Sequence, residues 1–354
     1  MTAGNNLENW YMNGTYEREI RLYQELSSPS VKVIIFDYSS DLSWSKAPNA
    51  LRVDITNYNI DVVPLYGGYT GNVTIIRLLF SFIIVLKSSL NLTHVKSNQS
   101  KGAWLGILYK IKNKQVRFLH RSGYSWSDFT FRLSGSWIKF FLTRLTEIIT
   151  NIFADEIHIA SNLDSKSFYN FERKKLKIVP NWVDVVSFSD VKRKNKSIFI
   201  GRLEVQKKIL ELVEVWPEEE HLTIVGAGSL LGEIKQTTVR RNLNVKFISS
   251  MHHPELMRLL SSCKCLVNWS DFEGNPKVIL EAIFCGVPVI GRNVAGVKQI
   301  LELGDFGYIV NNTKELHKAL QSVEYQKLDV KKIRKDLKSS TFEFTLNKNF
   351  TFLQ

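Results

Sequence analysis

The sequence predicts an α/β protein built from two Rossmann-like, doubly wound domains that face a central cleft. Two successive series of alternating strands and helices predict this fold class, and a basic segment over residues 192–196 separates them. The length of 354 residues exceeds one ordinary core and suits two α/β domains. We therefore predict an N-terminal domain over residues 1–190 and a C-terminal domain over residues 191–330, with a ligand cleft at the carboxyl ends of their strands.

Short apolar runs mark the strands of the first half, as in Val-Lys-Val-Ile-Ile-Phe over residues 31–36. Longer segments with helical length and capping residues mark its helices. The predicted strands cover residues 31–36, 61–65, 92–95, 116–120, 156–160 and 177–179. The predicted helices cover residues 15–26, 75–90, 102–111 and 137–153. This alternation favours a mainly parallel sheet.

The second half repeats the alternation more regularly, with glycines directly after its first two strands. Its predicted strands cover residues 197–200, 222–225, 245–248, 265–268, 287–290 and 308–310. Its predicted helices cover residues 209–216, 230–236, 255–261, 297–302 and 313–323, and one more begins at Pro276.

The start of the chain departs from this scheme. A doubly wound domain usually opens with a buried strand, but residues 1–13 contain no apolar run. We therefore expect the first strand to be missing or truncated. A start codon placed too late would explain this, and so would a divergent N-terminus.

The formal net charge of +13 favours an anionic partner, such as a phosphorylated ligand, an acidic membrane surface or a nucleic acid. The Lys/Arg runs lack interleaved aromatic residues and no recognition motif is present, so we expect no nucleic-acid partner. The three cysteines form neither a disulfide framework nor a zinc-binding spacing, which indicates a reducing, cytoplasmic compartment.

Two apolar segments raise the question of membrane contact. Residues 1–20 are polar, so we expect no signal peptide. The run over residues 75–86 is too short to span a bilayer. Like the segment over residues 137–153, it is either a buried helix or a helix lying in a membrane interface. We therefore expect a cytoplasmic protein, and peripheral attachment to the cytoplasmic membrane face stays an open alternative.

Residues 271–282, Asp-Phe-Glu-Gly-Asn-Pro-Lys-Val-Ile-Leu-Glu-Ala, are the most informative stretch. Pro276 suits the first position of a helix, which places Glu273 on the preceding loop and Glu281 inside the helix. The free N–H groups of the loop and of the helix N-terminus form an anion site. A carboxylate on each side of such a site suits a phosphate-centred ligand with hydroxyls at both ends, such as a nucleotide sugar.

A series of motifs in the second half resembles the retaining glycosyltransferases of the GT-B fold, family 4, described as glycosyl transferases group 1. The motifs are Pro-Asn-Trp-Val-Asp at 180–184, Gly-Arg-Leu at 201–203, Val-Gly-Ala-Gly at 225–228, the paired-Glu loop and Cys-Gly-Val-Pro-Val-Ile at 285–290. The first half matches loosely, through Gly14 and His120. The resemblance also implies that residues 331–354 cross back to the N-terminal domain.

The resemblance implies roles for four charged residues. Arg202 and Lys207 would neutralise the donor diphosphate, Glu273 would face the donor sugar, and Glu281 would accept hydrogen bonds from the ribose hydroxyls. The chemistry agrees, because breaking a glycosyl–phosphate bond places negative charge on the leaving oxygen, which fixed cations stabilise. Arg202, Lys207, Glu273 and His120 are the candidate catalytic residues, with His120 expected near the sugar and acceptor.

The remaining candidates bind the donor through the backbone. Gly274 and Asn275 would present N–H groups to the sugar or phosphate, and the turn at Gly14 would bring a helix N-terminus to the diphosphate. Gly201, Gly226 and Ile248 complete the predicted donor site, Ile248 lying near the base. A purely structural role stays open for three of these positions. In that alternative Gly14 and Gly226 are turn glycines without ligand contact, and His120 is a buried histidine of the core.

Three departures from the family pattern affect local loops: Trp182 and Lys208 replace glycines, and Ser229 replaces a proline. We find no Asp-x-Asp motif, and the resemblance implies a diphosphate held by cations and helix dipoles. We therefore expect no cofactor and no essential metal ion.

The expected function is transfer, with retained anomeric configuration, of a sugar from a UDP- or GDP-linked donor to a saccharide or lipid-linked saccharide. The products would belong to cell-surface polysaccharide, lipopolysaccharide or capsule. Two alternatives remain. One is a nucleotide-sugar epimerase of the same fold, and the other is a non-catalytic basic module that binds membrane or nucleic acid.

Overall fold

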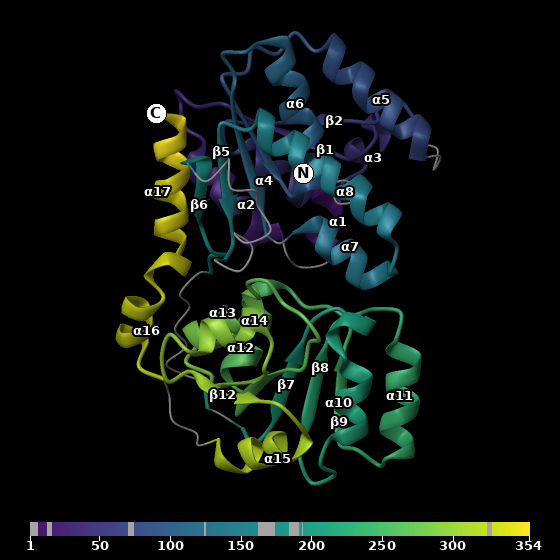
Figure 1. The fold of residues 1–354 in the computed structure, drawn as a ribbon, viewed down its shortest axis with the longest axis vertical. Coiled ribbons are helices and arrows are strands. Elements are labelled where there is room, and N and C mark those ends of the chain that lie inside the picture. The colour runs from purple at the N-terminus through teal and green to yellow at the C-terminus, as the bar shows by residue number, and fades with distance from the viewer. Residues whose placement is uncertain are drawn as a thin grey trace. The chain divides into compact units, whose positions relative to one another are not determined.

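The computed structural model describes residues 6–12, 16–69, 74–123, 125–161, 174–183, 191–192, 194–323 and 328–354. Its contacts divide the chain into two compact units (Figure 1). Unit 1 comprises Met1–Val179 together with Leu346–Gln354, and unit 2 comprises Pro180–Thr345. The division after Val179 precedes the boundary that we predicted after residue 190, and the last residues of the chain group with unit 1.

The strands of unit 1 form two parallel sheets in the described part of the chain. β1 (Val33–Asp37) pairs with β2 (Ile60–Pro64). A separate sheet has the order β3-β4-β5-β6. Its strands are β3 (His94–Asn98), β4 (Arg117–Ser122), β5 (Glu156–Ile159) and β6 (Leu176–Ile178). The expected single sheet is therefore interrupted between β1 and β3.

Helices connect these strands and bury their apolar side chains against both faces. A buried cluster joins Phe36 of β1 and Val95 of β3 with Ala103 and Leu105, so one hydrophobic layer runs along both sheets. The helices are α1 (Leu7–Met12), α2 (Tyr16–Leu26), α3 (Asp41–Ser45), α4 (Asn49–Thr56), α5 (Thr74–Lys87), α6 (Ala103–Lys112), α7 (Trp126–Ser134) and α8 (Trp137–Phe153). The final helix α17 (Phe342–Leu353) belongs to unit 1 from Leu346 onward.

Unit 2 is built around one six-stranded parallel sheet with the order β12-β11-β10-β7-β8-β9. The chain order reverses beside β7, which is the switch point where open α/β sheets bind ligands at the carboxyl ends of their strands. The strands are β7 (Ser197–Ile200), β8 (Leu222–Val225), β9 (Val245–Ile248), β10 (Cys265–Asn268), β11 (Val289–Arg292) and β12 (Gly307–Val310).

Two hydrophobic clusters cover the two faces of this sheet, as parallel strands require. One cluster contains side chains of α12 (His253–Ser261), α13 (Lys277–Phe284), α14 (Ala295–Leu301) and α16 (Val330–Asp336). The other contains side chains of α10 (Ile209–Val215), α11 (Leu231–Arg240) and α15 (Thr313–Ser322).

Several local predictions differ from the structure. Pro276 is the N-cap of α13 rather than its first helical residue. β4 runs on to Ser122, so His120 lies inside a strand and not at its end. Helices α1, α3, α4, α7 and α16 were not predicted. The prediction at Gly14 falls outside the described residues.

Candidate functional site

The carboxyl ends of β7 and β8 approach each other through glycines. A Cβ on Gly226, where φ is +149°, would lie 1.9 Å from the carbonyl oxygen of Gly201. A Cβ on Gly228 would lie 2.4 Å from the carbonyl oxygen of Leu203. The Gly201 N–H donates to the Val225 carbonyl at 3.0 Å. These glycines are needed because two backbone loops touch here, which supports the structural reading of Gly226.

An ion pair lies next to these loops. Lys207 ends the short 3₁₀ helix η3 (Val205–Lys207), and its Nζ donates to Glu273 Oε1 at 2.5 Å. The two side chains are 15% and 9% exposed. The structure therefore brings together two of the predicted site residues, which are far apart in the sequence, in a largely desolvated contact.

The hydrogen bonds around Glu273 fix its position. Glu273 Oε1 also accepts a hydrogen bond from the Ser270 hydroxyl at 2.6 Å, and Asn268 Nδ2 lies 3.5 Å away. Gln206 ties η3 to the same loop, since its side chain donates to the Phe272 carbonyl at 3.0 Å. The cation and the carboxylate are thus held by one hydrogen-bonded network across the carboxyl edge.

The Arg202 side chain is exposed. Arg202 belongs to the loop after β7, five positions before Lys207 in the sequence. Its Nη2 is 3.5 Å from Gln206 Oε1. Glu204 is turned toward Ser229, whose N–H and hydroxyl donate to its carboxylate at 3.0 and 2.8 Å. The Ser229 hydrogen bonds lower the pKa of Glu204. Ser229, where the family has proline, therefore links the β7 and β8 loops.

Glu281 lies inside α13 and is 4% exposed. His253, the first residue of α12, places its Nε2 at 3.0 Å from Glu281 Oε1. An Nε2–H on His253 would donate to the carboxylate and hold one of its oxygens in place. A carboxylate can accept several hydrogen bonds, so this contact is compatible with recognition of ligand hydroxyls.

The loop before α13 is packed tightly. A Cβ on Gly296 would lie 2.2 Å from the Gly274 carbonyl oxygen, so α14 presses against this loop. Asn275 Oδ1 accepts from the Asn181 N–H at 2.8 Å, and its carbonyl accepts from Asn181 Nδ2 at 2.5 Å. Asn181 therefore braces the loop, while Ile248 ends β9 and packs against the hydrophobic core.

The site candidate of unit 1 has a different environment. His120 is 1% exposed, and its Nδ1 lies 2.8 Å from the Ser97 hydroxyl on the neighbouring strand. Burial lowers the pKa of His120 to about 4, so the imidazole is neutral at pH 7. This arrangement is the one expected of a histidine that supports a sheet.

Sequence reasoning did not identify Ser270, Gln206 or His253, which orient the charged residues. Only Ser270 carried a local signal, because it lies three positions before Glu273. Within the described ranges, no three His, Cys, Asp or Glu side chains gather where they could hold a metal ion.

Comparison with known sequences is concentrated in unit 2. Residues 185–342 match the sequence model of the family described as "Glycosyl transferases group 1". N-acetyl-alpha-D-glucosaminyl L-malate synthase of Bacillus anthracis is 22% identical over 169 residues, covering 46% of this chain and 44% of that protein. UDP-Gal:alpha-D-GlcNAc-diphosphoundecaprenol alpha-1,3-galactosyltransferase of Escherichia coli is 27% identical over 214 residues, covering 51% and 54%. The chain thus spans about half the length of these curated relatives.

Solved structures resemble nearly the whole chain. Sucrose-phosphate synthase from Thermosynechococcus elongatus superposes with a TM-score of 0.76 at 16% identity, covering 96% of this chain and 92% of that one. HepE from Anabaena, solved with UDP and glucose, gives a TM-score of 0.70 at 14% identity, covering 99% and 96%. Likeness at these identities establishes the fold. Residues 185–342 thus carry the sequence pattern of the glycosyl transferases group 1 family, and the chain has the GT-B fold that the resemblance implied.

Proposed function

We propose that this protein is a retaining glycosyltransferase that moves a sugar from a nucleoside diphosphate sugar to a saccharide acceptor. One observation carries the proposal. The Lys207–Glu273 ion pair lies at the carboxyl edge of the unit 2 sheet, where such sheets bind ligands, and the family pattern assigns these two residues to the donor. Exposed Arg202 and buried Glu281 supply a further cation and a further carboxylate.

The charges suit departure of a diphosphate. Lys207 and Arg202 would stabilise the negative charge that develops on the leaving oxygen, Arg202 as a planar fork and Lys207 as a point charge. Because Lys207 is hydrogen-bonded to Glu273, the cation is held beside the carboxylate that would face the donor sugar. In a front-face mechanism the leaving phosphate takes the proton of the acceptor, so no enzyme nucleophile is required. Arg202 and Lys207 would take the place of a metal ion on the diphosphate.

The relatives support a UDP-linked donor. HepE was solved with UDP and glucose, and with UDP-glucose. The Escherichia coli relative is named for transfer from UDP-Gal to a diphosphoundecaprenol-linked sugar. We propose a UDP-sugar first, a GDP-sugar second, and an acceptor carried on a lipid diphosphate.

Helix α8 supports a lipid-linked acceptor, because its polar side chains are buried and its apolar side chains are exposed. It buries the polar residues Glu147, Thr150 and Asn151, and Glu147 accepts from the Ser127 hydroxyl at 2.6 Å. A surface helix of a globular protein normally buries its apolar face. The exposed face of α8 carries Trp137, Ile138, Phe141, Leu142, Leu145, Ile149 and Ile152.

Helix α5 adds further exposed apolar side chains to unit 1, namely Leu79, Phe80, Phe82, Ile83 and Leu86. No described helix is long and apolar enough to cross a membrane. The net charge of +13 would draw the protein to anionic lipids. We therefore propose that α8 lies in the interface of the cytoplasmic membrane face, where a lipid-linked acceptor is accessible.

Turnover of labelled donors tests the proposed activity. UDP- and GDP-sugars are incubated with the protein, EDTA and a membrane lipid extract, and products are followed by nuclear magnetic resonance. A transferase releases the nucleoside diphosphate and forms a product of unchanged anomeric configuration. An epimerised sugar formed without acceptor would support the epimerase, and the absence of turnover with every donor would favour a binding module.

Vesicle co-sedimentation tests the membrane proposal. We expect binding to vesicles with anionic lipid that falls at least about fivefold in an Ile138→Asp/Phe141→Asp variant, because two anchoring side chains are replaced by charges of the wrong sign. Val239→Asp is the control, since Val239 lies on unit 2 and is 81% exposed, compared with 74% for Ile138 and 64% for Phe141. Equal binding of the α8 variant and the control would contradict membrane contact through α8.

A further inference from the structure

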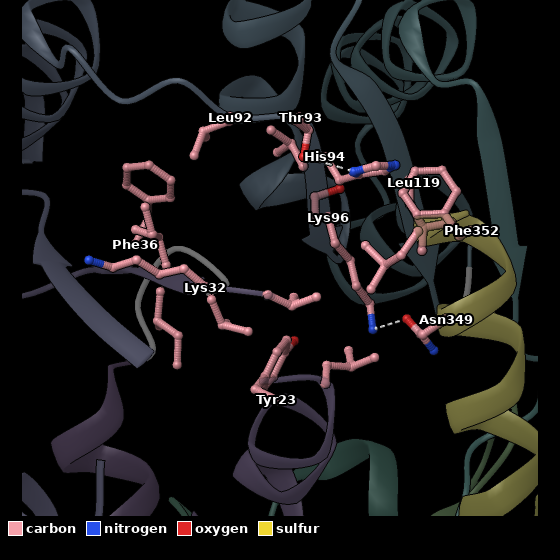
Figure 2. A pocket seen from close by; sticks show the side chains of 18 of the residues that line it. Tyr23, Lys32, Phe36, Leu92, Thr93, His94, Lys96, Leu119, Asn349 and Phe352 are labelled. Atoms are coloured by element: carbon pink, nitrogen blue, oxygen red, sulfur yellow. Dashed lines mark hydrogen bonds between the residues drawn. The ribbon is translucent and has the colours of Figure 1, made fainter. Parts of the chain in front are cut away.

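Unit 1 contains a cavity of about 640 Å³, which we call the β1–β3 cavity. Residues 30–36, which include β1, line one side of it, and residues 90–98, which include β3, line the other (Figure 2). More than half of the lining side chains are apolar, among them Ile34, Phe36, Leu92, Leu119, Phe352 and Leu353. A volume of this size and a mainly apolar lining with a few polar groups are typical of small-molecule sites.

Lys96 is the buried cation of this cavity. Its side chain extends from β3 toward α17, as Figure 2 shows. Its Nζ donates to Asn349 Oδ1 at 2.8 Å and lies 5.5 Å from the centroid of the Tyr23 ring. Both partners are uncharged, and within the described residues no carboxylate forms an ion pair with Lys96. A lysine that leaves water without gaining a counter-ion favours the neutral amine.

The titratable groups around Lys96 come from three neighbouring elements. α2 contributes Glu19 and Tyr23, β4 contributes Arg121, and β5 contributes His158. Burial and the positive charge of Arg121 lower the pKa of Lys96 to about 7, while the carboxylate of Glu19 acts in the opposite direction. Burial also lowers the pKa of His158 to about 4, so this imidazole is neutral at pH 7. A large fraction of Lys96 is therefore the free amine at neutral pH.

The ring that Lys96 contacts also carries a proton donor. Asn98 Nδ2 donates to the Tyr23 hydroxyl oxygen at 2.6 Å, so the proton of this hydroxyl remains available for another acceptor. Burial raises the pKa of Tyr23 to about 12, which keeps the hydroxyl protonated at neutral pH. A neutral amine and a phenolic O–H are the two groups that favour addition of an amine to a carbonyl compound.

We propose that Lys96 is a nucleophilic amine that binds an aldehyde with an apolar body as an imine in the β1–β3 cavity. The Lys96 nitrogen forms a bond to the carbonyl carbon, the carbonyl oxygen takes up a proton, and the nitrogen loses one. The hydroxyl formed in this way leaves as water together with the second proton of the nitrogen, which creates the C=N bond. The step needs no oxidant or reductant, and the apolar lining would hold the rest of the aldehyde.

This proposal is independent of glycosyl transfer. None of the described donor-site residues of unit 2 lines the β1–β3 cavity. A protein without transferase activity could therefore still form the imine, and an active transferase could fail to form it.

Reductive alkylation tests the proposal on the full chain. The protein is treated with propanal and cyanoborohydride at pH 7.5, and the alkylated fraction of each lysine is followed by peptide mass spectrometry. Lys32 is the internal control, because it lines the same cavity but pairs with Asp61 at 2.6 Å and is 55% exposed. We expect Lys96 to react at least about tenfold faster than Lys32, since an ion-paired ammonium group stays protonated. Equal rates, or a faster reaction at Lys32, would overturn the proposal.

The pH dependence separates the state of the amine from its accessibility. The rate at Lys96 relative to that at exposed lysines should be largest near pH 7.5. It should fall at least about tenfold by pH 10, where exposed lysines in general also become neutral. A ratio that does not change with pH would assign the selectivity to access alone and would contradict a nucleophilic Lys96.

Two substitutions of Asn349 separate charge from hydrogen bonding. Asn349→Asp places a carboxylate beside the ammonium group in a side chain of the same shape, and should slow the alkylation of Lys96 at least about tenfold. Asn349→Leu removes the acceptor without adding a charge, and should leave this rate unchanged within about twofold. Thermal unfolding checks that both variants are folded. An unchanged rate in Asn349→Asp, or the same loss in both variants, would refute the role of the neutral amine.

Discussion

Replacing Lys207 by methionine should destabilise unit 2, because it leaves the Glu273 carboxylate without its cation. Glu273 is 9% exposed and lies 2.5 Å from the ammonium group. Removing one partner of a buried pair costs about 3–5 kcal/mol, and the lower end applies because the Ser270 hydroxyl remains bound to Glu273. We therefore expect the free energy of unfolding to fall by about 3 kcal/mol, or about 6–12 °C in Tm for a unit of this size.

A double-mutant cycle isolates the pair. Lys207→Met combined with Glu273→Gln removes both charges, so the double variant should be more stable than Lys207→Met, with a coupling of about 2 kcal/mol. Native-state hydrogen exchange of the slowest amides in β7 and β10 reports the free energy of unfolding of unit 2 alone.

The exposed ion pair between Arg240 and Glu214 supplies the control cycle. Its side chains are 65% and 43% exposed, so its coupling should stay below about 1 kcal/mol. The reasoning is refuted if the Lys207–Glu273 coupling does not exceed that of this exposed pair.

Three further predictions concern the glycine contact, the buried carboxylate and the buried histidines. Gly226→Ala should lower the free energy of unfolding of unit 2 by about 3 kcal/mol, since its Cβ meets a carbonyl, whereas Gly232→Ala in an open helical position should raise it slightly. Glu281→Gln should weaken nucleoside diphosphate binding about tenfold in calorimetry, and a 2′,3′-dideoxy ligand should show no further loss in that variant. Burial lowers the pKa of His120 and of His158 to about 4. Between about pH 6.5 and pH 4 the unfolded chain therefore binds protons at these histidines that the folded chain does not bind, and the free energy of unfolding of unit 1 decreases as the pH falls. Each histidine should remove about 2 kcal/mol at pH 5, and His120→Gln should flatten the pH dependence of urea unfolding by about half.

The strands of unit 2 could be predicted almost to the residue. β7, β8, β9 and β10 have the predicted bounds, because each is a short, mostly apolar run between turn residues, and β7, β8 and β10 are also buried on both faces. Helices α3 and α7 were missed because they are short and depend on the N-cap hydroxyls of Ser40 and Ser125. Local capping supports such helices where apolar periodicity is weak.

Tertiary relations were harder to predict. The sequence indicated an apolar helix over residues 137–153, but not that its polar residues face inward, because only packing against Ser127 decides this. The contact of His253 with Glu281 joins two helices and leaves no local pattern. The absence of an apolar run in residues 1–13 was visible in the sequence, whereas the interruption of the sheet between β1 and β3 required the observed strand order.

Calorimetry of nucleotide binding tests the central claim most directly. UDP, GDP, ADP and their common sugars are titrated in EDTA into the wild type, the Arg202→Ala/Lys207→Ala variant and an Arg240→Ala control. Arg240 ends α11, away from the carboxyl edge, and carries the same charge. We predict that one nucleotide binds the wild type and the control equally, and binds the double variant about 100-fold more weakly or not at all. Binding of no nucleotide by the folded protein, or equal binding by all three proteins, would contradict the account.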